Sequence, residues 1–158
     1  MSESNDAGGG VEGAAAKPPP IDAAVLWTDG AARGNPGPAG GGAILKRPNG
    51  DVLAAESRYL GHTTNNVAEY KALLLGLERA KALGVLRLEV RADSELLIKQ
   101  LRGEYRVKNE GLKPLFAQAQ ALLSVFDSVV LTHVRRELNA EADELANAGI
   151  DQRGESHA

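Results

Sequence analysis

The sequence of 158 residues contains no cysteine, and aromatic residues make up only 4% of it. The missing thiols exclude disulfides, thiolate zinc sites and cysteine nucleophiles, and they agree with a reducing, cytoplasmic location. No apolar run approaches the roughly 20 residues of a membrane-spanning helix, so we expect no membrane association. The first 20 residues carry acidic side chains before their only lysine and have no apolar segment, which argues against a signal peptide.

An excess of positive charge is missing as well, because 18 Lys and Arg stand against 21 Asp and Glu. This balance disfavours strong binding of a polyanion. Both ends of the chain are acidic, whereas residues 21–150 are neutral. Since residues 1–20 lack apolar periodicity and end in three prolines, we predict a disordered tail there, a domain over 21–150 and a flexible C-terminus over 151–158. We expect a monomer.

Apolar periodicity predicts an α/β fold with the element order β-β-β-α-β-α-α-β-α. A nearly continuous apolar run indicates a buried first strand that ends at Asp29, and Asn139 is expected to cap the last helix. Strands joined through a helix are normally parallel, so the first, fourth and fifth strands should be parallel and the second antiparallel. The predicted strands are 23–27, 41–46, 52–60, 86–92 and 128–134, and the predicted helices are 67–83, 94–101, 114–126 and 139–148.

Four acidic residues are expected to meet at one edge of this sheet. Asp29 and Asp93 end parallel strands, Glu69 lies in the first turn of the helix 67–83, and Asp143 lies just past the first turn of the last helix. Open α/β sheets bind ligands at the edge where these strand ends lie. Clustered carboxylates repel unless one holds a proton or they share a cation, and oxygen ligands alone suit Mg²⁺ or Mn²⁺. The pattern therefore indicates a phosphoryl-transfer site.

Each feature also has a simpler interpretation. Singly, Asp29 suits a turn, Asp93 suits a helix cap, and Glu69 and Asp143 suit the positive ends of helix dipoles. The glycine-rich stretch 34–42 suggests nucleotide binding, but it lacks the Gly-Lys-Ser/Thr ending of a phosphate-binding loop. A kinase or ATPase of related architecture would need a second domain, for which the chain is too short. The alternative that the chain is an accessory domain of a polymerase, encoded as a separate chain, stays open.

Four segments resemble type 1 ribonuclease H and occur in the order of that family: 28–40 (TDGAARGNPGPAG), 64–70 (TNNVAEY), 92–95 (ADSE) and 142–147 (ADELAN). The resemblance implies a ribonuclease H-like fold whose five-stranded mixed sheet has the order 3-2-1-4-5. It also implies that Asp29, Glu69, Asp93 and Asp143 are the catalytic acids that bind metal. The implied activity is hydrolysis of the RNA strand of RNA–DNA hybrids with two Mg²⁺ ions, for which Mn²⁺ can substitute, giving 5′-phosphate and 3′-hydroxyl ends.

The same resemblance implies which residues contact the nucleic acid. Contacts to 2′-hydroxyl groups would distinguish RNA from DNA, and Thr64 and Asn109 match positions that grip a phosphate of the DNA strand. The alternative for the polar residues near the start of the helix 67–83 is turn and cap chemistry. The implied substrate-binding residues are Gly30, Ala31, Asn35, Thr64, Asn65, Asn66, Ser94, Glu95 and Asn109.

Three departures from the family pattern affect the expected specificity. The segment 101–112 is short and holds three cations, where many members carry a larger basic insertion, so we expect weaker binding and side activity on double-stranded RNA. Glu95 replaces a glutamine common in the family. His133 is interpreted as a partly buried strand residue rather than a catalytic helper. The alternative function is a non-catalytic hybrid-binding module, which would typically have lost one or more of the four acids.

Overall fold

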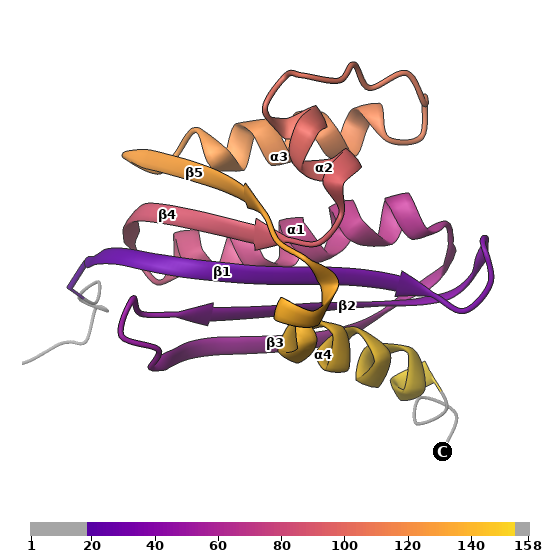
Figure 1. The fold of residues 1–158 in the computed structure, drawn as a ribbon, viewed down its shortest axis with the longest axis horizontal. Helices are drawn as coiled ribbons and strands as arrows, with labels where there is room; N and C mark the ends of the chain where they lie inside the picture. Colours follow the sequence, from indigo (N-terminus) through magenta and orange to yellow (C-terminus); the bar gives the residue numbers. More distant parts are fainter. Residues whose placement is uncertain (1–18, 154–158) are drawn as a thin grey trace, which may run out of the picture.

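The structure, a computed structural model, describes residues 19–153 and contains one five-stranded sheet of the order β3-β2-β1-β4-β5 (Figure 1). β1 pairs antiparallel with β2 and parallel with β4, and β4 pairs parallel with β5, which confirms the predicted fold class and topology. The strands are β1 (Ile21–Ala32), β2 (Gly37–Lys46), β3 (Val52–Thr63), β4 (Val85–Ala92) and β5 (Ser128–His133). The helices are α1 (Asn65–Ala82), α2 (Glu95–Leu101), α3 (Lys113–Leu123) and α4 (Ala140–Asp151), and the 3₁₀-helix η1 (Arg136–Leu138) precedes α4.

The domain boundaries stay a prediction. Residues 1–18 of the expected N-terminal tail and residues 154–158 of the expected C-terminus lie outside the described residues. α4 continues to Asp151, three residues beyond its predicted end. Within residues 19–153, no helix is both long and apolar enough to cross a membrane.

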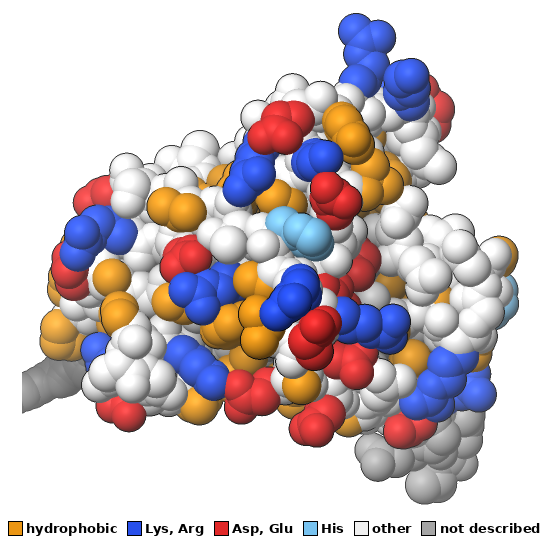
Figure 2. All heavy atoms as spheres, in the orientation of Figure 1, with side chains coloured by type: hydrophobic (Ala, Val, Ile, Leu, Met, Phe, Trp, Pro, Cys, Tyr) orange, Lys and Arg blue, Asp and Glu red, His pale blue; other side chains and the backbone are white. Residues whose placement is uncertain are grey.

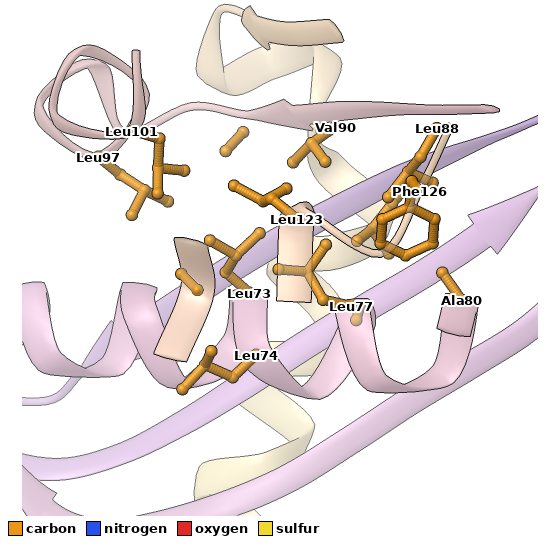
Figure 3. Packing of buried hydrophobic residues seen from close by; sticks show 14 of the residues in the cluster. Leu73, Leu74, Leu77, Ala80, Leu88, Val90, Leu97, Leu101, Leu123 and Phe126 are labelled. Carbon is orange, nitrogen blue, oxygen red and sulfur yellow. The ribbon is translucent and has the colours of Figure 1, made fainter. Parts of the chain in front are cut away.

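The helices form layers on both faces of the sheet (Figure 1). α1 packs on β1 and β2 and also contacts α3, whereas α4 packs on β1, β2 and β3 from the other side. The main core lies between α1, β4 and the two following helices, where Leu73, Leu77, Val90 and Leu123 are buried side by side (Figure 3). Since each buried leucine stabilises the fold by about 2 kcal/mol, this cluster holds α1 firmly against the sheet.

Several predicted boundaries differ from the structure, among them the ends of the first strand and of the third helix. β1 does not end at Asp29 but continues to Ala32, since Gly30 and its neighbours pair with β2 in a long hairpin. α3 ends at Leu123, so Phe126 lies after the helix, although it is still buried in the core. Thus the first acid lies within a strand rather than at its end.

Side-chain caps fix the starts of two helices, as expected near Thr64, whereas the second cap is Ser94 and not Asp93. The Thr64 hydroxyl accepts a hydrogen bond from the Val67 backbone N–H at 3.3 Å, and the Ser94 hydroxyl accepts one from Leu97 at 3.2 Å. α1 therefore begins two residues earlier than predicted, and Glu69 lies after its first turn rather than within it.

The expected side-chain cap of α4 is wrong. Asn139 does precede the helix, but its side chain makes no capping hydrogen bond. Instead, the Nδ2 group of Asn139 donates to the backbone oxygen of Thr28 on β1 at 2.9 Å. A buried partner on another element thus replaces the local partner that the sequence suggested.

The glycine-rich stretch belongs mainly to strand β2 and serves close packing. A Cβ atom at Gly40 would lie 2.1 Å from the Ala146 oxygen, and one at Gly42 would lie 2.4 Å from the Ala142 oxygen, so both glycines face α4. A Cβ at Gly41, on the opposite face of the strand, would lie 3.2 Å from the Ala72 Cβ on α1. The absence of side chains therefore lets α4 approach the sheet at backbone distance.

Replacing Gly42 by alanine is expected to lower the free energy of unfolding by roughly 3 kcal/mol, because the new methyl group meets helix backbone that cannot rotate away. Urea unfolding measures the change. The control is Gly111→Ala, whose Cβ would meet only the Asn109 side-chain oxygen, at 3.1 Å. Equal stability of the two variants would contradict the close approach of α4.

Candidate active site

Three carboxylates meet where β1 and β4 run side by side. Each of Asp29, Glu69 and Asp93 offers an oxygen atom, and these atoms all lie within 4.8 Å of one another. Thr28 on β1 is paired with Ala92 on β4, so the residues that follow them, Asp29 and Asp93, are neighbours. The convergence expected from strand direction is thus observed for these three acids.

Glu69 reaches the cluster because α1 lies directly against β1. A Cβ atom at Gly30 would lie 2.2 Å from the Ala68 backbone carbon, so only glycine fits after Asp29. The Gly30 backbone N–H donates a hydrogen bond to Glu69 Oε1 at 3.2 Å. One glycine therefore both admits the helix and orients the carboxylate that the helix carries.

Asp143 approaches the cluster from the other face of the sheet. It lies in the first turn of α4. Burial is the main cause of the raised pKa of Asp29, and the nearby Asp143 carboxylate adds to the shift. It is not part of the group whose oxygens all lie within 4.8 Å of one another. The fourth predicted acid is therefore a neighbour of Asp29 rather than a member of the tight group.

The electrostatics of the cluster favour a bound proton or cation. Burial, followed by the charges of Glu69 and Asp93, raises the pKa of Asp29 to about 9. Burial, followed by the charge of Asp93, raises the pKa of Glu69 to about 8, although the hydrogen bond from Gly30 opposes the shift. In the metal-free protein near neutral pH, carboxylates this close share protons. A divalent cation would occupy the same position, and the donor set of hard oxygen atoms fits Mg²⁺ or Mn²⁺.

The acids open into a groove of about 440 Å³. Arg136 on η1 also lines it, and the charge of Arg136 lowers the pKa of Glu69. Sequence reasoning missed this residue, since a lone arginine in a short loop carries no specific signal. The residues that line the groove are Asp29, Gly30, Ala31, Ala32, Asn65, Glu69, Asp93, Ser94, Arg136 and Asp143.

Five residues predicted to bind substrate are not among those lining the groove: Asn35, Thr64, Asn66, Glu95 and Asn109. Asn35 shapes the loop beside the groove, because its side-chain oxygen accepts a hydrogen bond from the Asn65 backbone N–H at 3.0 Å. Asn65 in turn accepts one from the Ala32 N–H at 3.0 Å. Glu95 forms an ion pair with Lys99 at 3.0 Å. The turn and cap chemistry considered for these polar residues is therefore present.

Asn109 and His133 differ in how the structure places them. Asn109 lies between α2 and α3, where its side-chain oxygen accepts a hydrogen bond from the Gly111 N–H at 2.7 Å. His133 is exposed, so its predicted partial burial is wrong. Because β5 is an edge strand and His133 is its last residue, alternation along the strand does not bury this side chain.

Comparison with known proteins relates residues 27–149 to a family model described as "Reverse transcriptase-like". The chain is 43% identical over 135 residues to a bifunctional protein of Mycobacterium tuberculosis, of which it spans 37%, while the match covers 85% of this chain. The solved N-terminal RNase H domain of that protein superposes with a TM-score of 0.82 and 42% identity, covering 87% of this chain and 99% of the domain.

Two further relatives are ribonucleases by name. A ribonuclease HI of Halobacterium salinarum is 43% identical over 125 residues, which are 79% of this chain and 63% of the relative. An RNase H1 isolated from compost, solved in complex with an RNA/DNA hybrid, is 44% identical with a TM-score of 0.78 and covers 82% of this chain and 98% of its own. The chain thus spans about a third of the length of the Mycobacterium tuberculosis protein and about two thirds of the length of the Halobacterium salinarum enzyme.

Proposed function

Because this chain belongs to the ribonuclease H family, whose members are hydrolytic nucleases, we propose that it is an endoribonuclease that cleaves the RNA strand of RNA–DNA hybrids. The observation that carries the proposal is the group of three carboxylates within 4.8 Å of one another beside an open groove. A relative with 44% identity was solved with such a hybrid, which supports the choice of substrate. We place this activity, also as a proposal, in a monomer in the cytoplasm.

In the proposed site, Asp29, Glu69, Asp93 and Asp143 hold two divalent cations, with Mg²⁺ the expected ion and Mn²⁺ a substitute. Asp29 would be the central metal ligand, because each of the other three carboxylates raises its pKa and thus lies near it. The bound cations would supply an activated water and Lewis-acid stabilisation of the departing 3′ oxygen. In this hydrolysis a bond would form from the water oxygen to phosphorus and the bond from phosphorus to the 3′ oxygen would break. The water would lose a proton and the 3′ oxygen would gain one, which would leave 5′-phosphate and 3′-hydroxyl ends.

Recognition of RNA is assigned to the wall of the groove. Gly30, Ala31, Asn65 and Ser94 line it, so their polar groups would contact 2′-hydroxyls near the scissile phosphate. Asn35, Asn66 and Glu95 would support this wall from outside the groove, and Thr64 and Asn109 would contact a phosphate of the DNA strand.

The surface charge favours a weak grip on the hybrid. Figure 2 shows acidic and basic side chains interspersed over the face in view, without a continuous positive stripe. Several cations are paired with acids, including Lys46 with Glu141 and Arg91 with Glu89. Binding of the hybrid should therefore depend on contacts in the groove more than on long-range electrostatic attraction. Side activity on double-stranded RNA is also part of the proposal.

The test is a cleavage assay on labelled RNA–DNA hybrid, double-stranded RNA and double-stranded DNA, each with Mg²⁺, Mn²⁺ or chelator. Hybrid cleavage is expected with either metal and not with chelator, at least about 10²-fold faster than cleavage of DNA. Undiminished cleavage in chelator would overturn the metal-dependent mechanism. Binding of the hybrid without cleavage under all conditions would instead identify a non-catalytic binding module.

His133 does not line the groove that holds the four acids, and this position predicts a small role in turnover. Replacing Asp143 by alanine should lower kcat by about 10²-fold, whereas His133→Ala should lower it by less than about threefold. Steady-state kinetics on the hybrid measure both variants. The reverse order of effects would assign proton transfer to His133 and contradict the placement of Asp143 beside Asp29.

A further inference from the structure

A buried residue, Asn139, links the start of α4 to the strand that carries Asp29 by a side-chain hydrogen bond. Asn139 is 1% exposed, and its Nδ2 group donates to the Thr28 backbone oxygen at 2.9 Å. Thr28 immediately precedes Asp29 on β1. The backbone oxygen of Asn139 also accepts the N–H of Asp143 at 3.1 Å. Asn139 is thus hydrogen-bonded both to Asp143 and to the residue that precedes Asp29.

We infer that Asn139 is a positioning residue that fixes the separation between Asp143 and Asp29. The inference rests on the proposed function, because it concerns two of the acids assigned to that site. Asn139 itself touches neither the carboxylates nor, in the proposal, the substrate. It acts through the first turn of α4, which it holds against β1.

The other hydrogen bonds that hold α4 to the sheet lie further along the helix. The Ser57 hydroxyl on β3 donates to the Leu145 backbone oxygen at 2.6 Å, and the Gln152 side chain donates to Ser57 Oγ at 3.1 Å. In the first turn, Lys46 forms an ion pair with Glu141, whose side chain is 61% exposed. Exposed ion pairs constrain geometry weakly. Asn147 contacts Asp143 directly, since its Nδ2 group donates to the Asp143 backbone oxygen at 3.0 Å, but this hydrogen bond lies within α4 and does not reach the sheet. Among the described residues, the Asn139 amide is therefore the buried side-chain hydrogen bond that joins the sheet to the start of α4.

The hydrogen bonding of Asn139 suits positioning better than stability. An asparagine before a helix commonly caps free N–H groups of the first turn, but this side chain points away to β1. Its Oδ1 atom is buried without a partner among the described residues, which costs free energy. Because the Asn139 side chain leaves the helix uncapped and its own oxygen unpaired, it adds little to the free energy of unfolding. Its hydrogen bond to β1 does, however, set the position of the turn that carries Asp143.

The test uses Asn139→Leu, which keeps the branched shape without a donor, and Asn139→Ala as a second variant. Wild-type cleavage of the hybrid is measured first, since its absence would refute the proposed function and not this inference. In both variants kcat is expected to fall by about 10–100-fold, the usual effect of removing a residue that orients a metal ligand. KM and hybrid affinity in chelator should change by less than about twofold, because the groove wall on β1 and α1 is untouched.

The matched control is Ser57→Ala, which removes a half-buried side-chain hydrogen bond from the sheet to α4. Melting temperatures of all variants and calorimetric titration with Mn²⁺ accompany the kinetics. Two results together would support the inference. The Asn139 variants would bind Mn²⁺ more weakly than the wild type, and Ser57→Ala would keep wild-type kcat although its melting temperature falls by a similar amount. Wild-type kcat in the Asn139 variants, or an equal loss of kcat in Ser57→Ala, would overturn it and leave Asn139 with a structural role only.

Discussion

Replacing Asp29 by asparagine is expected to abolish metal-dependent cleavage of the hybrid and to leave the protein folded. The neutral amide keeps the shape of the side chain but removes the charge that the proposed cations need. A fall in kcat of at least about 10³-fold, about 4 kcal/mol of transition-state stabilisation, is the expected size. Because the wild-type carboxylate is buried among like charges, the variant should be at least as stable as the wild type in chelator.

The control for this variant is Asp22→Asn, which makes the same chemical change on the same strand. Asp22 is exposed and pairs with Arg87, far along β1 from the cluster. It should keep wild-type kcat. Steady-state kinetics and thermal melts of both variants are compared, and more than about a tenth of wild-type activity in Asp29→Asn would contradict the central role of Asp29.

The second large effect concerns stability, pH and metal together. The pKa of Asp29 is raised from 3.8 to about 9 and that of Glu69 from 4.5 to about 8. At pH values between the unfolded and the folded pKa of each group, the folded protein binds more protons than the unfolded chain. The free energy of unfolding therefore falls as pH rises through this range. In chelator, the melting temperature should therefore drop between pH 5 and pH 8, by several degrees or more. Added Mg²⁺ should restore it at pH 8, because the cation replaces the protons in the folded state only.

Thermal melts at pH 5, 6, 7 and 8, with chelator and with Mg²⁺, measure this linkage. The lowered pKa of Glu89, caused first by its hydrogen bond from Arg91, affects stability below this window and not within it. Asp29→Asn serves as the control and should show a flatter dependence on pH. A melting temperature that rises steadily with pH in chelator would refute the shared protons of the cluster.

The parts of the fold that the sequence predicts are those specified by local signals. The cap at Thr64 depends on residues a few positions apart, and it is present. The meeting of Asp29 with Asp93 followed from strand direction alone, because neighbouring parallel strands end at the same edge. Chain order therefore predicted the core of the candidate site.

The remaining features depend on contacts between residues far apart in sequence. The Asn139 side chain bonds a strand 111 positions away rather than its own helix, and the exposure of His133 depends on β5 lying at the edge of the sheet. Arg136 lines the groove because η1 places it there. Propensity and alternation describe only neighbours along the chain, so they did not reveal these three positions.

The glycines of β2 that face α4 have a mechanical consequence. Packed side chains can absorb small displacements by changing rotamer, whereas two main chains in direct contact cannot. With Gly40 and Gly42 beneath it, α4 has a fixed height above the sheet. The distance from α4 to β2 should therefore fluctuate little, which makes this side of the site stiff before any ion or nucleic acid binds.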